Sequence, residues 1–175
     1  MKQKILFVFV EGVNDERFVK RVIAPMLEKK YDSIKPLKYA QEIPKNVNKS
    51  LMGIKAIGYD YVFFADINKE PCITAKKEKI QNKYNSTDKD KIMVVVKEIE
   101  SWYLAGLTDI KLKGWKIPPF TTTDNITKEQ FEHLIPRNFG RTDFMLEILN
   151  NYSPKTAKQR NGSFKYFIDK NKLKV

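Results

Sequence analysis

Two short apolar runs stand out in the first half of the chain, at residues 5–10 and 61–65. Both are rich in β-branched and aromatic side chains, with no polar residue inside them. Such runs are typical of strands that are covered on both faces, as in a parallel sheet. A similar run at 92–96, and a weaker one at 34–39 that Pro36 interrupts, predict two further strands.

Segments with apolar residues at helical spacing separate these runs. The pattern predicts helices over about 15–29, 46–57 and 74–84, with Pro25 as a kink in the first and Gly58 at the end of the second. Alternating strands and helices are typical of an α/β fold with right-handed crossovers. We therefore expect a mostly parallel four-stranded sheet flanked by helices.

The pattern changes after the fourth predicted strand. Helices are expected at 98–107, 128–134, 141–150 and 164–172, and the stretch 114–125, with two prolines and three threonines in a row, is expected to be an extended loop. We expect an α/β domain over 1–107, with 108–175 as a helical C-terminal cap that packs on it.

Polar residues directly follow two of the predicted buried strands. Glu11 and Gly12 come after the first, and Asp66 and Asn68 come at the end of the third. Functional groups of a parallel sheet collect at the carboxyl ends of its strands. If the two strands are neighbours, Glu11 and Asp66 form a site for Mg²⁺ or Mn²⁺, because these ions prefer oxygen ligands. Asn68 would add a carbonyl or water contact, and Gly12 would let a phosphate approach the backbone. The alternatives are a helix-capping acid at 11 and a turn residue at 66.

A third acidic position follows the fourth predicted strand. Glu98 and Glu100 cannot share one face of a helix, so one should point inward and reach the same edge of the sheet. We favour Glu100, because Trp102 and its neighbours then pack beside it, and Glu98 is the second choice. The alternative is a solvated helix start whose acids complement the helix dipole.

The charge of the chain is strongly positive, at +12 over 175 residues. This excess indicates a polyanionic partner such as DNA or RNA, although lysine-rich composition also arises from AT-rich genomes. Basic residues interleaved with aromatic ones near the end are candidates for nucleic-acid contacts: Lys155, Lys158, Arg160 and Lys165. The aromatic residues there are equally the buried face of an amphipathic helix.

The remaining composition narrows the class of protein. A single cysteine, Cys72, excludes an internal disulfide and fits a reducing cytoplasm. No apolar run is long enough to predict a signal peptide or a membrane span. One histidine, His133, excludes a multi-histidine zinc site, and we expect it to be structural.

The acidic positions, taken together, resemble the signature of the Toprim domain. That family has a Val-Glu-Gly motif with an acid a few residues on, which matches residues 10–12 with Asp15, and an Asp-x-Asp motif, which matches 66–68 except for Asn68. The stretches 96–105 and 163–167 are also similar to small stand-alone Toprim proteins. Those proteins are related to the nuclease half of the overcoming-lysogenization-defect (OLD) proteins.

The resemblance implies metal-dependent cleavage of phosphodiester bonds in DNA or RNA, in phage defence. Glu11 would bind metal or move a proton, and Lys97 or Lys155 would stabilise charge on the phosphate. One or two metals remain open, because Asn68 replaces an acid. No ATP-binding motif occurs in the chain, so any ATPase partner would be a separate subunit. The alternative is a non-catalytic nucleic-acid-binding or partner-dependent module of a defence system.

Overall fold

The computed structural model describes residues 3–175, which divide into two compact units between Val94 and Val95. The sequence places the division later, at 107/108. The two divisions differ over helix α5 (Ile99–Ala105), whose contacts are with α7 (Lys128–Leu134), α8 (Arg141–Asn150) and α9 (Pro154–Arg160). The helix therefore forms part of the core of the second unit.

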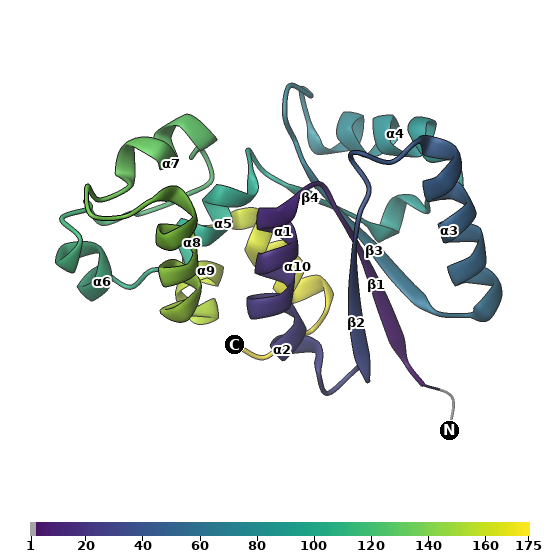
Figure 1. Ribbon diagram of the computed structural model, residues 1–175, viewed down its shortest axis with the longest axis horizontal. Helices are drawn as coiled ribbons and strands as arrows, with labels where there is room; N and C mark the ends of the chain where they lie inside the picture. The colour runs from purple at the N-terminus through teal and green to yellow at the C-terminus, as the bar shows by residue number, and fades with distance from the viewer. Residues whose placement is uncertain (1–2) are drawn as a thin grey trace. The chain divides into compact units, whose positions relative to one another are not determined.

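The first unit contains a four-stranded, all-parallel sheet with helices around it (Figure 1). Its strands are β1 (Ile5–Val10), β2 (Ser33–Lys38), β3 (Asp60–Asp66) and β4 (Ile92–Val95), in the order β2-β1-β3-β4. Strand β1 pairs in parallel with β2 on one side and β3 on the other. The α/β fold expected from the apolar runs is confirmed.

The first predicted helix is continuous but changes its winding. It consists of α1 (Val13–Phe18), a π-helical segment (Val19–Ile23) and α2 (Ala24–Leu27). Pro25 lies in the first turn of α2, where its missing N–H is tolerated. In the wider turn before it, the Ala24 N–H donates to the Val19 carbonyl. Where the sequence predicts a kink at Pro25, the structure has a π-helical segment just before the proline.

The other two helices of this unit lie where the spacing predicts them. Helix α3 (Pro44–Ile57) ends at Gly58, which adopts a left-handed conformation with φ 77°. Helix α4 (Ile73–Lys83) follows β3, and a short 3₁₀ turn (Lys89–Lys91) leads into β4. A left-handed residue at the end of a helix lets the chain reverse direction, and glycine adopts it without steric cost.

Aromatic side chains dominate the core between the sheet and these two helices. The rings of Phe9 on β1 and Phe63 on β3 stack with centroids 4.4 Å apart, and Tyr39 and Tyr84 pack against Phe63 at 5.1 and 5.8 Å. Leu51 of α3 closes the same cluster and is fully buried. The alternation of strand residues places this set on one face of β1 and β3.

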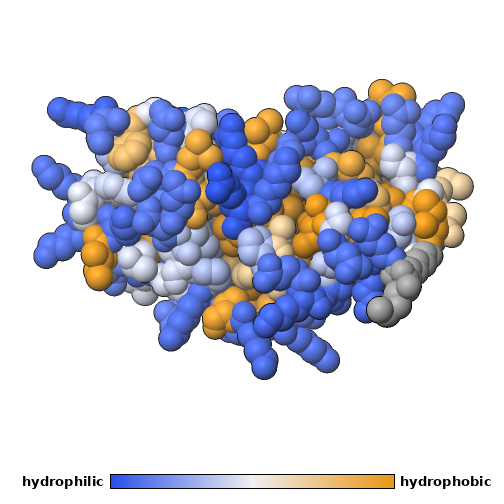
Figure 2. All heavy atoms as spheres, turned by 60° about the horizontal axis from the view of Figure 1, so that its bottom comes forward, coloured by the Kyte–Doolittle hydropathy of each residue, from blue (hydrophilic) through white to orange (hydrophobic). Residues whose placement is uncertain are grey.

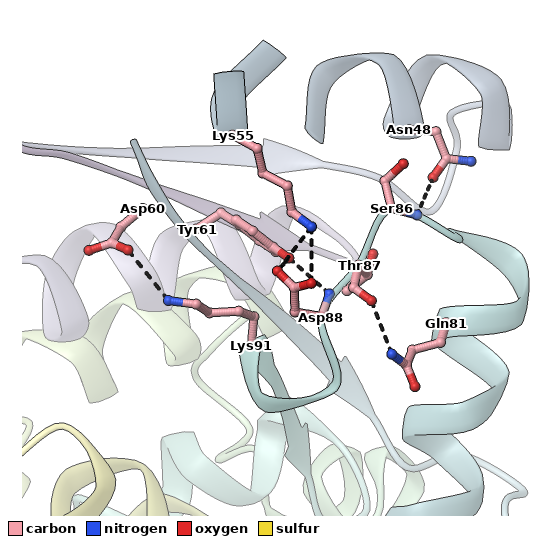
Figure 3. Close-up of polar contacts among 9 residues, drawn as sticks. All are labelled: Asn48, Lys55, Asp60, Tyr61, Gln81, Ser86, Thr87, Asp88 and Lys91. Atoms are coloured by element: carbon pink, nitrogen blue, oxygen red, sulfur yellow. Dashed lines mark hydrogen bonds and ion pairs between the residues drawn. The ribbon is translucent and has the colours of Figure 1, made fainter. Parts of the chain in front are cut away.

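A polar cluster fastens the opposite end of β3, remote from the carboxyl ends of the strands (Figure 3). The Asp88 carboxylate accepts the Tyr61 hydroxyl at 2.7 Å and lies 3.0 Å from the Lys55 ammonium. The backbone N–H of Asp88 in turn donates to the Tyr61 hydroxyl at 2.9 Å. The hydrogen bond from Tyr61, followed by that from Lys55, holds the pKa of Asp88 below its ordinary value.

The regular elements that the structure describes after β4 are all helices, joined by loops. Its helices are α5, α6 (Asp109–Gly114), α7, α8, α9 and α10 (Gly162–Lys170). Helices α6 and α9 were not expected. Each is short, and each buries a single side chain, Leu112 in α6 and Ala157 in α9, so neither has the apolar periodicity on which the prediction rests.

A buried polar network joins the starts of α5 and α10 in this unit. The Ser163 hydroxyl accepts the Trp102 indole N–H at 2.8 Å and the Val96 N–H at 3.3 Å, and donates to the Asn161 amide oxygen at 2.8 Å. The Asn161 oxygen also caps α10 by accepting the Phe164 N–H. Because every member of the network has a partner, the network fixes α10 against α5 at little desolvation cost.

The face drawn in Figure 2 is covered largely by hydrophilic side chains, as expected from the composition, with scattered apolar ones between them. Large apolar side chains that remain exposed include Ile43, Met52 and Ile110. Within residues 3–175, no helix has the length and apolar character needed to span a membrane.

Candidate functional site

The order of the strands identifies the place where a ligand site is expected. The chain runs from β1 to β2 on one side of β1, and then crosses to β3 on the other side. In open α/β sheets, ligands bind at this switch point, outside the carboxyl ends of the two strands. Glu11 follows β1 and Asp66 ends β3, so both flank the switch point. The adjacency that the sequence required of these strands is present.

The Glu11 carboxylate is the centre of this edge of the sheet. Its Oε1 atom accepts the Asp66 backbone N–H at 3.2 Å and the Tyr39 hydroxyl at 3.2 Å, and lies 3.5 Å from the Lys76 ammonium. These three contacts, with Asp66, Tyr39 and Lys76, all fall on Oε1. The side chain is 26% exposed, so the carboxylate is only partly covered.

Tyr39 positions the Glu11 carboxylate through a hydrogen bond. Its ring is packed in the aromatic core and is 4% exposed, and its hydroxyl lies within hydrogen-bond distance of both Glu11 and the Phe64 carbonyl. Burial, and then the negative charge on Glu11, raise the pKa of Tyr39 well above its ordinary value. The phenol therefore remains a hydrogen-bond donor throughout the physiological range.

Lys76 is a member of the site that the sequence analysis did not single out. It projects from α4, its side chain is only 7% exposed, and its ammonium pairs with Glu11. A signal for it exists in the sequence. Lys76 lies four residues before Ile80, which is on the buried face of α4, so helical spacing directs the lysine inward.

The turn after β1 brings a further acid to the same edge. Helix α1 begins at Val13, and the Gly12 N–H donates to the Asp15 carboxylate at 3.1 Å. Asp15 is 6% exposed. This contact closes the first turn of α1, and it places the acid of the Val-Glu-Gly-x-x-Asp pattern beside the residue that follows Glu11.

Asn68 closes the turn after β3. It adopts a left-handed backbone conformation with φ 53°, and its amide nitrogen donates to the Asp66 carbonyl at 3.2 Å. Asparagine tolerates this conformation better than most residues. The side chain is exposed, and its amide oxygen is the atom that could serve as a ligand.

The two glutamates after β4 have partners within the second unit. Glu100 is the buried one, at 4% exposed, and it pairs with the Arg141 guanidinium at 2.5 Å. Burial raises the pKa of Glu100, and Arg141 opposes this shift. Arg141 also pairs with Glu132, and the Glu98 carboxylate accepts the Lys128 N–H. Both carboxylates thus stabilise the junction of α5 with α7 and α8, and their role as metal ligands stays a prediction.

The predicted basic residues differ in their availability. Lys158 and Lys165 both pair with Asp169, at 2.8 and 2.6 Å, and Arg160 binds the Leu107 carbonyl and the Asp109 carboxylate. Arg160 is therefore a structural residue that ties α9 to the start of α6. Lys97 and Lys155 are exposed, and Lys97 has a left-handed backbone with φ 61°.

The residues at the switch point fit a single hard cation. Glu11 and Asp66 supply carboxylate oxygens, the ligands that Mg²⁺ prefers, and Mg²⁺ typically uses only one or two of them. Within residues 3–175, no three His, Cys, Asp or Glu side chains are grouped closely enough to enclose a metal ion. A metal ion there would depend on these two carboxylates, and its binding stays a prediction.

The chain is similar in structure to the C-terminal region of the Burkholderia pseudomallei OLD protein. The TM-score is 0.50 and the sequence identity is 16%, over 97% of this chain and 99% of that chain. No protein-family model matches the chain, and no curated protein matches it. At this identity the similarity is one of fold, and it supports the expected relation to OLD proteins at that level.

Proposed function

We propose that this protein is a Toprim-type nuclease that cleaves phosphodiester bonds of DNA or RNA with the help of Mg²⁺ or Mn²⁺. The observation that carries the proposal is the contact between the Glu11 carboxylate and the backbone of Asp66, at the switch point of the sheet. The motif around Glu11 and the likeness in fold to an OLD protein region support the same function.

Glu11 and Asp66 would hold the cation, which supplies charge neutralisation and an activated water when bound. Tyr39 and the Asp66 N–H orient the Glu11 carboxylate through Oε1, and Oε2 would be the atom that binds the cation. Lys76 provides a fixed positive charge within 3.5 Å of that carboxylate. An ammonium at this distance is placed to stabilise negative charge that develops on a phosphate, the role that the sequence analysis gave to Lys97 or Lys155.

The test is cleavage of plasmid DNA and structured RNA in Mg²⁺ or Mn²⁺ by the wild type and by the variants Glu11→Gln and Asp66→Asn. Both variants should lose at least about 100-fold in rate, because each removes a charge from the metal site. Asp60→Asn is the matched control, since Asp60 lies on the same strand at its opposite end. Cleavage that persists in both site variants would reject the proposal.

A second candidate is a nucleic-acid-binding module that becomes active only with a partner, such as a separate ATPase subunit in phage defence. The ion pair between Lys76 and Glu11 favours it, because a lysine beside the carboxylate opposes the binding of a cation. Salt-sensitive binding without turnover in any divalent metal, followed by cleavage when the partner is added, would select this candidate.

A further inference from the structure

A groove in the second unit has the composition of a binding site and has no part in the acidic site. It lies between the end of α6 and the end of α7, with a volume of about 720 Å³. Its lining includes Trp115, Lys116, His133 and Arg137. All of its lining residues belong to 114–138, so the groove is built within one unit.

The two charged side chains that line the groove, Lys116 and Arg137, are both basic. Lys116, His133 and Arg137 are exposed, and no aspartate or glutamate lines the groove. Within residues 3–175, neither Lys116 nor Arg137 forms an ion pair, whereas Lys158 and Lys165 share Asp169. Cations without acidic neighbours attract an anionic ligand most strongly, because nothing else compensates their charge.

The end of helix α6 determines where Lys116 lies in the groove. Lys116 lies just past α6 with φ 58°, where the Ile117 N–H donates to the Leu112 carbonyl at 2.9 Å and the Lys116 N–H to the Lys113 carbonyl at 3.0 Å. Glycine is the favoured residue at this position of such a helix end. Lys172 adopts the same conformation after α10, so this is a feature of the helix end, and at α6 it places the lysine at the rim of the groove.

Aromatic and proline side chains form much of the remaining wall. The Trp115 ring packs edge-on against Phe139 and Phe144, with centroids 6.1 and 5.3 Å apart, and Pro118 and Pro136 line the same groove. The His133 ring is held by a 2.6 Å contact between Nδ1 and the Glu129 carbonyl. Aromatic, proline and imidazole side chains can stack against the bases of a single strand. In a duplex the bases are stacked inside and are not available for such contacts.

We propose that this groove binds single-stranded nucleic acid, with Lys116 and Arg137 on phosphates and the apolar wall against bases. The inference rests on the proposed function only in taking nucleic acid as the substrate. Combined cations and apolar platforms favour a single strand over a duplex, which presents phosphates but no base faces.

The test measures the affinity of the protein for a fluorescein-labelled oligothymidylate by fluorescence anisotropy. EDTA in the buffer removes divalent metal, so that no cleavage occurs. Lys116→Gly and Arg137→Gln should each weaken binding several-fold and lower the slope of log K against log salt by about 0.7. Lys116→Gly should also keep or raise Tm, because glycine suits the left-handed position. Lys113→Gln, an exposed lysine of α6 that does not line the groove, is the control.

Two results would overturn the proposal: a loss of binding in both variants no larger than that of the Lys113→Gln control, or an equal loss of binding for a duplex of the same length. Glu11→Gln should bind the oligonucleotide normally. If the groove variants bind normally while Glu11→Gln loses cleavage, the groove is wrong and the nuclease stands. If the groove variants lose binding while Glu11→Gln still cleaves, the groove stands and the proposed nuclease site is wrong.

Discussion

At the scale of single residues, the sequence identifies the acids but not what surrounds them. Glu11 and Asp66 could be selected because each ends a buried strand, and the parallel sheet brings those ends to one edge. Lys76 and Tyr39 contact Glu11 from α4 and from the loop after β2. Such partners depend on tertiary packing between segments that no local pattern relates.

Lys76→Gln separates the binding of metal from catalysis. The substitution removes the ammonium 3.5 Å from Glu11, a charge that repels a cation, so the affinity for Mn²⁺ should rise. The rate of cleavage should fall by about tenfold or more, because negative charge on the phosphate is no longer stabilised. Mn²⁺ titration by electron paramagnetic resonance and the plasmid assay measure the two effects. Lys79→Gln, on an exposed part of the same helix, is the control. Affinity and rate that fall together would contradict this role.

Glu100→Gln tests the buried ion pair of the second unit through pH. Because burial raises the folded-state pKa of Glu100, its contribution to stability is largest at low pH and is lost as pH rises through the folded pKa, above the ordinary value of about 4.3. Glutamine lacks this loss, and Arg141 keeps Glu132 as a partner. The Tm of the variant relative to wild type should therefore rise with pH.

Thermal unfolding between about pH 4 and 7 measures this difference. Glu78→Gln, which removes an exposed carboxylate, controls for the loss of one charge. A gap between Glu100→Gln and wild type that stays constant over this range, or that shrinks as pH rises, would show that burial does not dominate at Glu100.

At the scale of elements, predictability follows apolar periodicity. Strands β1, β3 and β4 and helices α3, α7 and α8 lie within a few residues of their predicted bounds, because each has a long or regular apolar pattern. Helices α6 and α9 escape prediction because neither has a regular apolar face. Instead, Ser153 caps α9, and Arg160 joins α9 to the start of α6. The π-segment before Pro25 is likewise a product of context.

Ser163→Ala tests the network that joins α10 to α5. The change leaves the buried Trp102 indole N–H without its acceptor, which should lower the free energy of unfolding by about 1–3 kcal/mol. Chemical denaturation followed by tryptophan fluorescence gives this value. Ser50→Ala, at an exposed position of α3, should be neutral. A Ser163→Ala variant as stable as wild type would mean that the hydroxyl is replaced by water.

At the scale of the whole molecule, the sequence predicts charge and fold class but not the distribution of charge. The excess of +12 includes cations that are held in ion pairs, such as Lys158 and Lys165, and others with no acidic neighbour at the groove, such as Lys116 and Arg137. The tail, chosen for its density of lysine, is thus less available than its composition suggests. Ion pairs between residues in different segments decide which lysines are available, and the composition of the chain does not show these pairs.

The most direct test of the central claim is the position of Mn²⁺ in crystals of the protein, located by its anomalous diffraction. The account requires a peak at the switch point of the sheet, about 2.0–2.2 Å from oxygens of both Glu11 and Asp66, a typical distance for such ligands. Glu11→Gln crystals should lose the peak. A wild-type crystal that binds Mn²⁺ elsewhere, with nothing at this edge under conditions that support cleavage, would contradict the account.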